Sequence, residues 1–472
     1  MKSIIKKTAL SLMLASCAGG AMAQTLNSGY FMDGFTYRHE TNPAYMDDSY
    51  FSMPILGQFN VGFRGNFGLE NFIFTHPDPT SKYELTTGFH PNISADQFLG
   101  ELTDNNKLMF TMKTSIFSMG FKGFGGFNTI GLNLRMNMGL NLPYGLFEFA
   151  KRGMYGDTNY QLDDLSIRAR GWAELALGHA RPINENLTIG AKLKFLVGGA
   201  DLEATLKDAY IDLKQNAWRI KANAEVNASL KGAYFTTDAD GEVDGLEVES
   251  PGVGGFGLGL DLGATYKFTD GPLEGLKLSA AVLDFGFINW SDNAKAVNDG
   301  EEFTFEGFKD KDGNYNYHNI AIDDEGEGRK LEDQMDILGD DLEKLYNVRT
   351  DGEIGSRKTM LAATLNFGAE YPLPMYDKLK FGLLSSTYID GPFTWTEGRL
   401  SANVNPTKWF GLGVNYAIST FGSSFGMLLN FHPKGFNFFV GTDCMLSDVN
   451  TQFIPLNSNA NVMMGINFIL GH

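Results

Sequence analysis

The sequence predicts an all-β protein, a transmembrane antiparallel β-barrel of about 14 strands, with an uncertainty of about two either way. Two observations carry this prediction. The chain holds 56 glycines and 38 phenylalanines but only 20% charged residues, a composition typical of a sheet with many turns. Apolar and polar residues also alternate over runs of roughly nine to thirteen residues, which match the length of a tilted membrane-crossing strand. A β-sandwich or an extracellular solenoid is the alternative, but its strands are usually shorter.

The first 23 residues read as a secretory signal peptide. Three lysines precede an apolar stretch, and Ala21-Met22-Ala23 is typical of a cleavage site before Gln24. Cleavage and lipid attachment at Cys17 is the alternative, because Leu14 to Cys17 also fits the pattern of a lipoprotein. We favour cleavage before Gln24, since the mature chain reads as an integral barrel rather than a lipid-anchored protein.

Charge and cysteine content exclude several classes of function. The formal net charge is -18, and removal of the signal makes it more negative, because lysines are the only charged residues of the signal. A phosphate backbone would be repelled, so nucleic-acid binding is excluded. Cys444 is the single cysteine of the mature chain, which permits neither an internal disulfide nor a zinc site built on cysteines. No run of 18 apolar residues follows the signal, so no transmembrane helix is predicted.

Each predicted strand has one apolar face and one polar or small face. In residues 130–142, for example, Ile130, Leu132 and Leu134 alternate with Gly131 and Asn133. The same pattern covers residues 187–198, 220–231, 256–268, 361–371, 410–418, 425–431 and 462–470. Because only a closed barrel pairs every backbone group of a strand in lipid, these strands are expected to close on themselves.

The charged residues of these strands predict which face looks into the lumen. A Lys or Arg on the lipid face costs about 2–4 kcal/mol, so the polar face must point inward. The predicted lumen-facing residues are Arg135, Arg168, Arg170, Lys192, Lys194, Lys221 and Glu225. The six basic residues of this set form a ladder, which either attracts anionic groups, as rings of Arg and Lys do in pores, or is neutralised by inward acids such as Glu174 and Glu225.

Three regions do not read as membrane-crossing strands. Residues 24–54 are polar and aromatic. Residues 69–107 contain a short helix candidate from Ser94 to Leu102, with Ser94 and Gln97 at the spacing of a capping box. Residues 291–358 form a long acidic insertion with 19 acidic and 9 basic residues, in which Asp333 to Tyr346 has helical spacing. Long loops of bacterial barrels face outward, so we expect an extracellular position for this insertion.

The C-terminus and several short blocks resemble known proteins. The ending from Gly465 to Leu470 resembles the signal that the barrel-insertion machinery reads. The blocks Arg38 to Ala44, Leu142 to Phe147 and Asp284 to Trp290 resemble an uncharacterised family of outer-membrane proteins from Bacteroidota. That family is distantly similar to FadL-type transporters of hydrophobic molecules, which carry an Asn-Pro-Ala motif in an N-terminal hatch.

The resemblance implies that residues 24–54 form a hatch inside a barrel of residues 55–472. Arg38, His39, Asn42 and Pro43 are its candidate functional residues, with Asn42-Pro43-Ala44 matching the motif. We therefore expect an integral protein of the Gram-negative outer membrane that passively transports a small hydrophobic or amphipathic molecule. A non-transporting scaffold that docks another envelope or secretion protein is the alternative.

An enzyme is the least favoured class, and we predict no catalytic residue, metal site or cofactor. Gly252 to Gly257 matches a dinucleotide motif, but it runs directly into a predicted strand rather than a helix. Gly422 to Gly426 matches a serine-nucleophile motif, yet the alternation continues through it as a strand, without the strand–turn–helix context. The seven histidines are scattered singly, without the spacing of a metal site.

Overall fold

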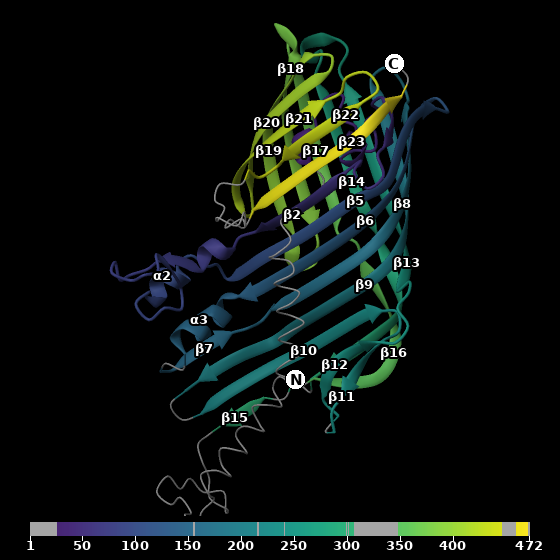
Figure 1. The fold of residues 1–472 in the computed structure, drawn as a ribbon. Helices are drawn as coiled ribbons and strands as arrows, with labels where there is room; N and C mark the ends of the chain where they lie inside the picture. Colours follow the sequence, from purple (N-terminus) through teal and green to yellow (C-terminus); the bar gives the residue numbers. More distant parts are fainter. Residues whose placement is uncertain are drawn as a thin grey trace, which may run out of the picture.

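The computed structural model describes residues 26–470 except 154–155, 215–216, 240, 299, 301, 306–347 and 446–458. The signal peptide therefore lies outside the described residues. The chain folds into a closed antiparallel barrel of 14 strand positions, which confirms the predicted fold class (Figure 1). The barrel closes at its first position, because β1 and β2 both pair with β23 on one side and with β5 on the other.

The wall strands occur in chain order, and five positions are shared by two segments. They are β1 (Ser49–Ser52) with β2 (Phe59–Gly65), β5 (Asn105–Gly123), β6 (Gly126–Pro143), β7 (Thr158–Gln161) with β8 (Ser166–Pro182), β9 (Leu187–Leu213), β10 (Trp218–Leu230) with β13 (Gly255–Lys267), β14 (Lys277–Val297) with β15 (Phe303–Phe305), β16 (Arg349–Met360) with β17 (Ala363–Leu373), β18 (Tyr376–Ile389), β19 (Trp395–Thr407), β20 (Phe410–Ser419), β21 (Gly422–Phe431), β22 (Asn437–Thr442) and β23 (Ala460–Leu470).

Small elements lie in the connections and in the N-terminal segment. They are the 3-10 helices η1 (Asn27–Gly29), η2 (Arg38–Glu40), η3 (Leu69–Asn71), η4 (Gly271–Leu273) and η5 (Gly391–Phe393), the helices α2 (Ala95–Leu99) and α3 (Tyr144–Arg152), and the hairpins β3 (Ile73–Thr75) with β4 (Leu85–Thr87) and β11 (Ala233–Thr237) with β12 (Val243–Val248). Among the described helices, none has the length and apolar character to cross a membrane.

Two segments predicted as separate strands, 220–231 and 256–268, occupy one strand position. β10 pairs with the second half of β9, with Trp218 opposite Leu213, and β13 pairs with the first half, with Tyr266 opposite Leu187. β14 runs past both of them on the other side. The hairpin of β11 and β12 leaves the wall between them. Alternation reports the face of a residue and not its neighbour strand, so one interrupted strand reads like two.

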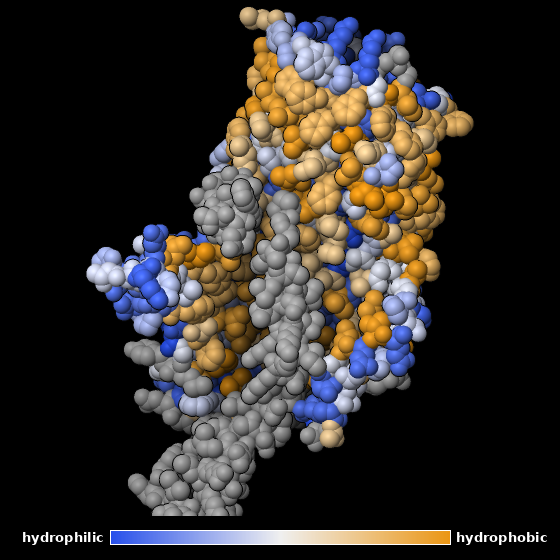
Figure 2. All heavy atoms as spheres, in the orientation of Figure 1, coloured by the Kyte–Doolittle hydropathy of each residue, from blue (hydrophilic) through white to orange (hydrophobic). Residues whose placement is uncertain are grey.

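The outer face of the wall is apolar. On β6, Leu132, Leu134 and Met136 are exposed, whereas Asn133 between them is buried inside the barrel. The other strands repeat this pattern, with outward Ile167, Leu175, Leu177, Ile189, Leu193, Phe195, Phe256, Leu258, Phe367, Leu383, Leu400, Ile418, Phe425 and Phe468. Figure 2 shows one face of the barrel, where an orange apolar surface lies below a blue upper rim. An exposed apolar surface of this extent needs a cover, and single exposed apolar residues do not.

Short turns and long connections lie at opposite ends of the barrel. β5 and β6 are joined by Phe124 and Gly125 alone, both at positive φ, as a tight hairpin turn requires. At the other end, residues 66–104 and 144–165 form long connections that carry α2 and α3 (Figure 1). Part of the predicted acidic insertion 291–358 belongs to β14, β15 and β16, which is a correction of its bounds. Its centre, including the predicted helix from Asp333 to Tyr346, lies outside the described residues.

The predicted helix start at Ser94 is confirmed. The Ser94 hydroxyl accepts a hydrogen bond from the Gln97 amide at 3.1 Å, which caps α2. The helix ends at Leu99 rather than at Leu102. Its Phe98 is buried in a cluster with Phe67 and Phe147, so α2 and α3 pack together beside the barrel.

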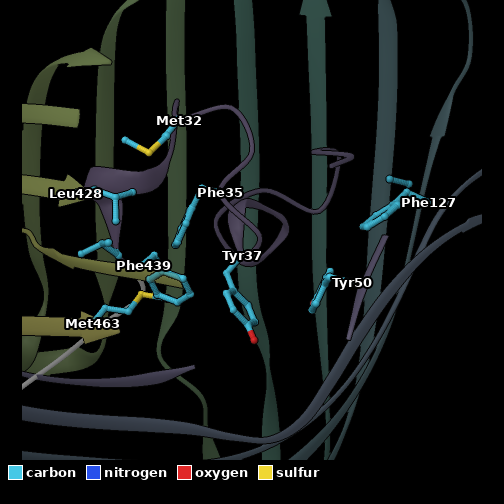
Figure 3. Packing of buried hydrophobic residues seen from close by; sticks show 10 residues of the cluster. Met32, Phe35, Tyr37, Tyr50, Phe127, Leu428, Phe439 and Met463 are labelled. Carbon is cyan, nitrogen blue, oxygen red and sulfur yellow. The ribbon is translucent and has the colours of Figure 1, made fainter. Parts of the chain in front are cut away.

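The N-terminal residues 26–48 lie inside the barrel, and we call them the N-terminal segment. Phe35 and Tyr37 project from it toward Phe439 on β22 and Met463 on β23 (Figure 3). These side chains are nearly fully buried, and the ring centroids of Phe35 and Phe439 lie 5.0 Å apart. Residues 49–52, which the sequence placed with this segment, are instead part of the wall as β1. The segment fills the middle of the lumen.

Candidate functional site

The Asn-Pro-Ala motif docks against two wall strands. The Asn42 amide donates hydrogen bonds of 3.2 Å to the carbonyls of Ala264 on β13 and Ala280 on β14. Its oxygen accepts from the Ala44 amide at 2.9 Å, which fixes the turn through Pro43. The wall makes room with glycine, because a Cβ at Gly263 would lie 2.1 Å from the Asn42 oxygen.

Gly190 on β9 likewise lets the backbone of Pro43 approach the wall, because it has no side chain. A Cβ at Gly190 would lie 2.2 Å from the Pro43 carbonyl oxygen, closer than real contacts allow. Neither Gly190 nor Gly263 was predicted from the sequence to contact the segment. Both were read as small residues on the polar face of a strand, and nothing in the alternation says which glycine faces another backbone.

Arg38 organises the charged side of the segment. Its guanidinium lies 2.8 Å from Asp33 and 2.9 Å from Asp47, and it covers the ring of Tyr45 at 4.6 Å. Asp33 in turn contacts Lys380 on β18 at 2.5 Å. The predicted hatch residue Arg38 therefore holds the segment in its folded shape, and Asp33 ties that shape to the wall.

His39 lies against the basic ladder. The Lys192 ammonium is 3.3 Å from Nδ1 of His39 and donates to its carbonyl oxygen at 3.1 Å. Nε2 of His39 is 2.8 Å from the Tyr50 hydroxyl, which is 2.6 Å from the hydroxyl of Ser118. Burial, with the positive charge of Lys192 beside it, lowers the pKa of His39 to about 3, so the ring is neutral.

Glu40 supplies the negative charge at this contact. Its carboxylate lies 2.5 Å from the Lys113 ammonium on β5 and accepts a hydrogen bond from Gln58. Although burial opposes ionisation, the charges of Lys113 and Lys192 lower the pKa of Glu40 to about 2. Lys113 was not among the predicted lumen residues, although it lies directly opposite Arg135 on the neighbouring strand.

Most members of the predicted ladder are paired with acids. Arg135 lies 3.0 Å from Glu174 and 2.7 Å from Asp284, and Lys194 lies 2.7 Å from Asp261 and 2.6 Å from Asp284. Arg168 contacts Asp390, and Arg170 contacts Asp201. In the middle of the ladder, inward acids therefore lie against the basic residues and compensate their charge.

The last two predicted residues lie apart from this centre. Lys221 and Glu225 are half-buried on β10. Glu225 lies 3.4 Å from Lys295 on the neighbouring β14 and accepts from Asn227, so it does not neutralise the ladder as expected.

A second charged cluster holds the start of the segment. The Asp443 carboxylate accepts hydrogen bonds from the backbone amides of Asn27 and Ser28 at 2.9 and 2.6 Å. Glu397 accepts from the Asn27 side chain and lies between Arg64 and Arg399, at 2.8 and 3.1 Å. This cluster was not predicted from the sequence, because its members come from β2, β19 and the residue after β22.

Two cavities flank the segment. The smaller one, of about 20 Å³, lies among His39, Glu40 and the paired charges around Arg135, and has room for about one water molecule. The other, of about 60 Å³, is bordered by Asn27 and Thr41 of the segment and by wall residues including Tyr388 and Trp395. Among the described residues, no group of three metal-ligating side chains comes together.

Comparison with known proteins identifies the family. The model of the family of unknown function DUF5723 matches residues 43–443, and the chain belongs to this family. The predicted resemblance to an uncharacterised family is therefore confirmed. Among curated proteins, no sequence matches the chain.

Solved structures of transporters are similar to the chain along its length. They include the toluene transporter TbuX of Ralstonia pickettii, with 9% identity and a TM-score of 0.40 over 96% of this chain and 95% of that one. The toluene transporter TodX of Pseudomonas putida has 10% identity and a TM-score of 0.37, over 96% and 95% of the two chains. A FadL homologue of Pseudomonas aeruginosa has 11% identity and a TM-score of 0.38, over 95% and 98%.

Proposed function

We propose that this member of DUF5723 is an integral outer-membrane barrel that passively transports a small hydrophobic or amphipathic molecule. The N-terminal segment acts as its hatch. The family has no known function, so the proposal rests on this chain's own residues. The observation that carries it is the way the segment docks, through separate hydrogen bonds and ion pairs to many strands, beside its buried aromatic side chains. Contacts of that kind can be exchanged for those of a passing molecule.

The apolar outer face supports the location. Its residues alternate with inward polar ones on nearly every strand, as a lipid-facing wall requires. We propose export through the signal peptide of residues 1–23, cleavage before Gln24, and insertion by the machinery that reads the ending at Leu470. The short turns then face the periplasm and the long connections face outward.

The docked segment closes the path through the lumen. With the segment docked, the two cavities beside it measure about 20 and 60 Å³, less than the roughly 150 Å³ that holds benzene. Passage of a larger molecule between these described residues therefore requires the segment to move. The segment binds the wall directly through Asn42, Glu40 and Asp33. When the segment leaves, Lys113 loses the carboxylate of Glu40 and Lys380 loses that of Asp33.

A disulfide that locks the segment tests this proposal. The side chains of Thr36 and Asn437 meet at 3.0 Å, so Thr36→Cys with Asn437→Cys, in a Cys444→Ser background, joins the segment to β22. The readout is the entry of the fluorescent amphipath 1-N-phenylnaphthylamine into cells that carry the barrel in a lipopolysaccharide outer membrane. We expect oxidation to reduce entry to the rate of cells without the protein, and a reductant to restore it.

A wall disulfide serves as the matched control. Thr387 and Thr396 meet at 3.0 Å between β18 and β19, away from the segment, so their double cysteine variant should leave entry unchanged on oxidation. Equal entry with the hatch pair oxidised and reduced would contradict the transport proposal. The compensated charges and the filled lumen would then favour the second candidate, a closed barrel that docks another envelope protein.

A further inference from the structure

The larger cavity has the features of a binding site on the path past the segment. It lies between Asn27 and Thr41 of the segment and the wall residues Leu283, Asn366, Tyr388 and Trp395. Six wall strands contribute to it, β5, β6, β14, β17, β18 and β19. It is therefore walled by rigid strands on one side and closed by the segment on the other.

Aromatic rings form the apolar part of this cavity. The rings of Tyr388 and Trp395 are stacked, with centroids 6.0 Å apart and an angle of 25° between their planes. The Arg64 guanidinium covers the Trp395 ring at 4.0 Å, and Phe393 and Met109 pack against the same pair. Because these side chains are buried and held on several sides, they form a rigid apolar border of the cavity.

Two polar atoms on cavity-lining residues are buried without a hydrogen-bond partner among the described residues. They are Nε1 of Trp395, a donor, and Oδ1 of Asn366, an acceptor. The Asn366 amide nitrogen donates to the carbonyl of Thr41 at 3.0 Å, so the segment itself fixes the side chain. An unpaired buried polar group is costly, and a ligand that pairs it recovers that loss.

The charges of the cavity are already compensated. Arg135 and Asp284 line it, but they bind each other through two hydrogen bonds of 2.7 and 2.9 Å. Lys113 is held by Glu40. A ligand with a net charge would have to break one of these pairs, whereas a neutral ligand would not.

We propose that this cavity binds a small neutral molecule that combines a ring with a hydroxyl or amide group. The ring lies against the apolar border that Tyr388 and Trp395 form, an acceptor of the ligand takes the Trp395 N–H, and a donor pairs the Asn366 oxygen. The inference rests on the proposed function and deepens it, because it narrows the transported class to neutral amphipathic molecules.

Size couples this binding to the hatch. A cavity of about 60 Å³ is smaller than the roughly 150 Å³ known to hold benzene, so a ring-bearing ligand needs more room. The strands of the wall cannot give way, but Asn27 and Thr41 belong to the segment. A bound ligand thus displaces the segment from Asn366, and binding and opening favour each other.

Three probes of similar size test the proposal on the purified full-length protein in mild detergent. They are phenol, which is neutral and polar, toluene, which has no polar group, and benzoate, which is an anion. Equilibrium dialysis measures the dissociation constant of each. We expect saturable binding of phenol, with weaker binding of toluene and benzoate.

The variant Trp395→Phe keeps the aromatic ring but removes the N–H. We expect it to weaken phenol binding by about fivefold, the value of one ordinary hydrogen bond, and to change toluene binding less than about twofold. Trp409→Phe, at a half-exposed turn, is the matched control and should change neither. Heat-dependent migration in gels verifies that each variant still forms the barrel.

The outcomes separate this inference from the proposed function. Equal phenol binding by Trp395→Phe and the parent protein, or tighter binding of toluene or benzoate than of phenol, overturns the site. Saturable phenol binding with the expected Trp395 effect upholds it, even if locking the segment leaves dye entry unchanged and the transport proposal fails.

Discussion

At the scale of single residues, the docked segment depends on side chains whose charge state is set by burial. His39 is the clearest case, since it is buried and neutral beside the Lys192 ammonium. When the segment leaves the wall, His39 enters water and titrates near its ordinary pKa of about 6.5. The docked state keeps the pKa of His39 at about 3. Between pH 3 and pH 6.5, His39 therefore binds a proton in the displaced state but not in the docked state.

Lowering the pH from 6.5 to 4.5 should therefore loosen the segment. The displaced state binds more protons in this window, so the docked state loses at most about 1.4 kcal/mol per pH unit. Glu40, with its pKa lowered to about 2, adds a similar loss only below about 4.5. The measurement is hydrogen exchange of backbone amides in residues 26–48, corrected for intrinsic rates. In His39→Gln the pH dependence between 6.5 and 4.5 should vanish, whereas Glu40→Gln should retain it.

Sequence reasoning found one partner of most ion pairs and missed the other. Arg135 and Lys194 were predicted to face inward because strand alternation and the cost of a lipid-facing charge fix their side. Their partner Asp284 lies in β14 at positive φ, where the strand departs from regular geometry. Alternation cannot place such a residue, and it cannot tell which inward charges from distant strands meet.

At the scale of elements, the fit between the segment and the wall depends on absent side chains. Gly190→Ala should weaken docking while leaving the barrel intact, because the new Cβ would meet the backbone of Pro43 at 2.2 Å. We expect docking to lose about 1–3 kcal/mol, the usual cost of overpacking. Faster amide exchange across residues 26–48, with unchanged heat-dependent migration in gels, is the expected result.

Gly398→Ala is the control for this substitution. Gly398 also lies in a wall strand, β19, but no described atom lies within 4 Å of its added Cβ. Slow exchange of the segment in both variants would show that Pro43 does not need the space at Gly190. Fast exchange in both would point instead to a general effect of alanine in the wall.

The strands themselves were largely predictable, and their interruptions were not. A period of two identifies β6, β9 and β21 from their residues alone, because each exposes one face to an apolar surrounding. The β11–β12 hairpin between β10 and β13 and the break between β1 and β2 depend on pairing with β9, β5 and β23. Those partner strands lie far along the chain, so the residues next to an interruption do not predict where it occurs.

At the scale of the whole molecule, the barrel reverses the usual arrangement of a globular protein, with apolar residues outside and charged residues inside. Asn, Ser and Thr side chains fill much of the interior, and the N-terminal segment completes it. This reversal was visible in the sequence, since composition and alternation do not depend on which strands are neighbours. Docking of the segment could be expected only through the Asn-Pro-Ala resemblance.

The outer face gives the last prediction, which tests whether the barrel crosses a bilayer. Leu134 points outward in the middle of β6, so Leu134→Arg puts a charge against the acyl chains and should cost about 2–4 kcal/mol. Ile183→Arg lies in the short turn before β9, where the charge reaches water, and should cost much less. The measurement is the free energy of unfolding by denaturant from lipid vesicles. Equal losses for the two variants would mean that Leu134 does not face lipid, because a charge in water carries no such penalty.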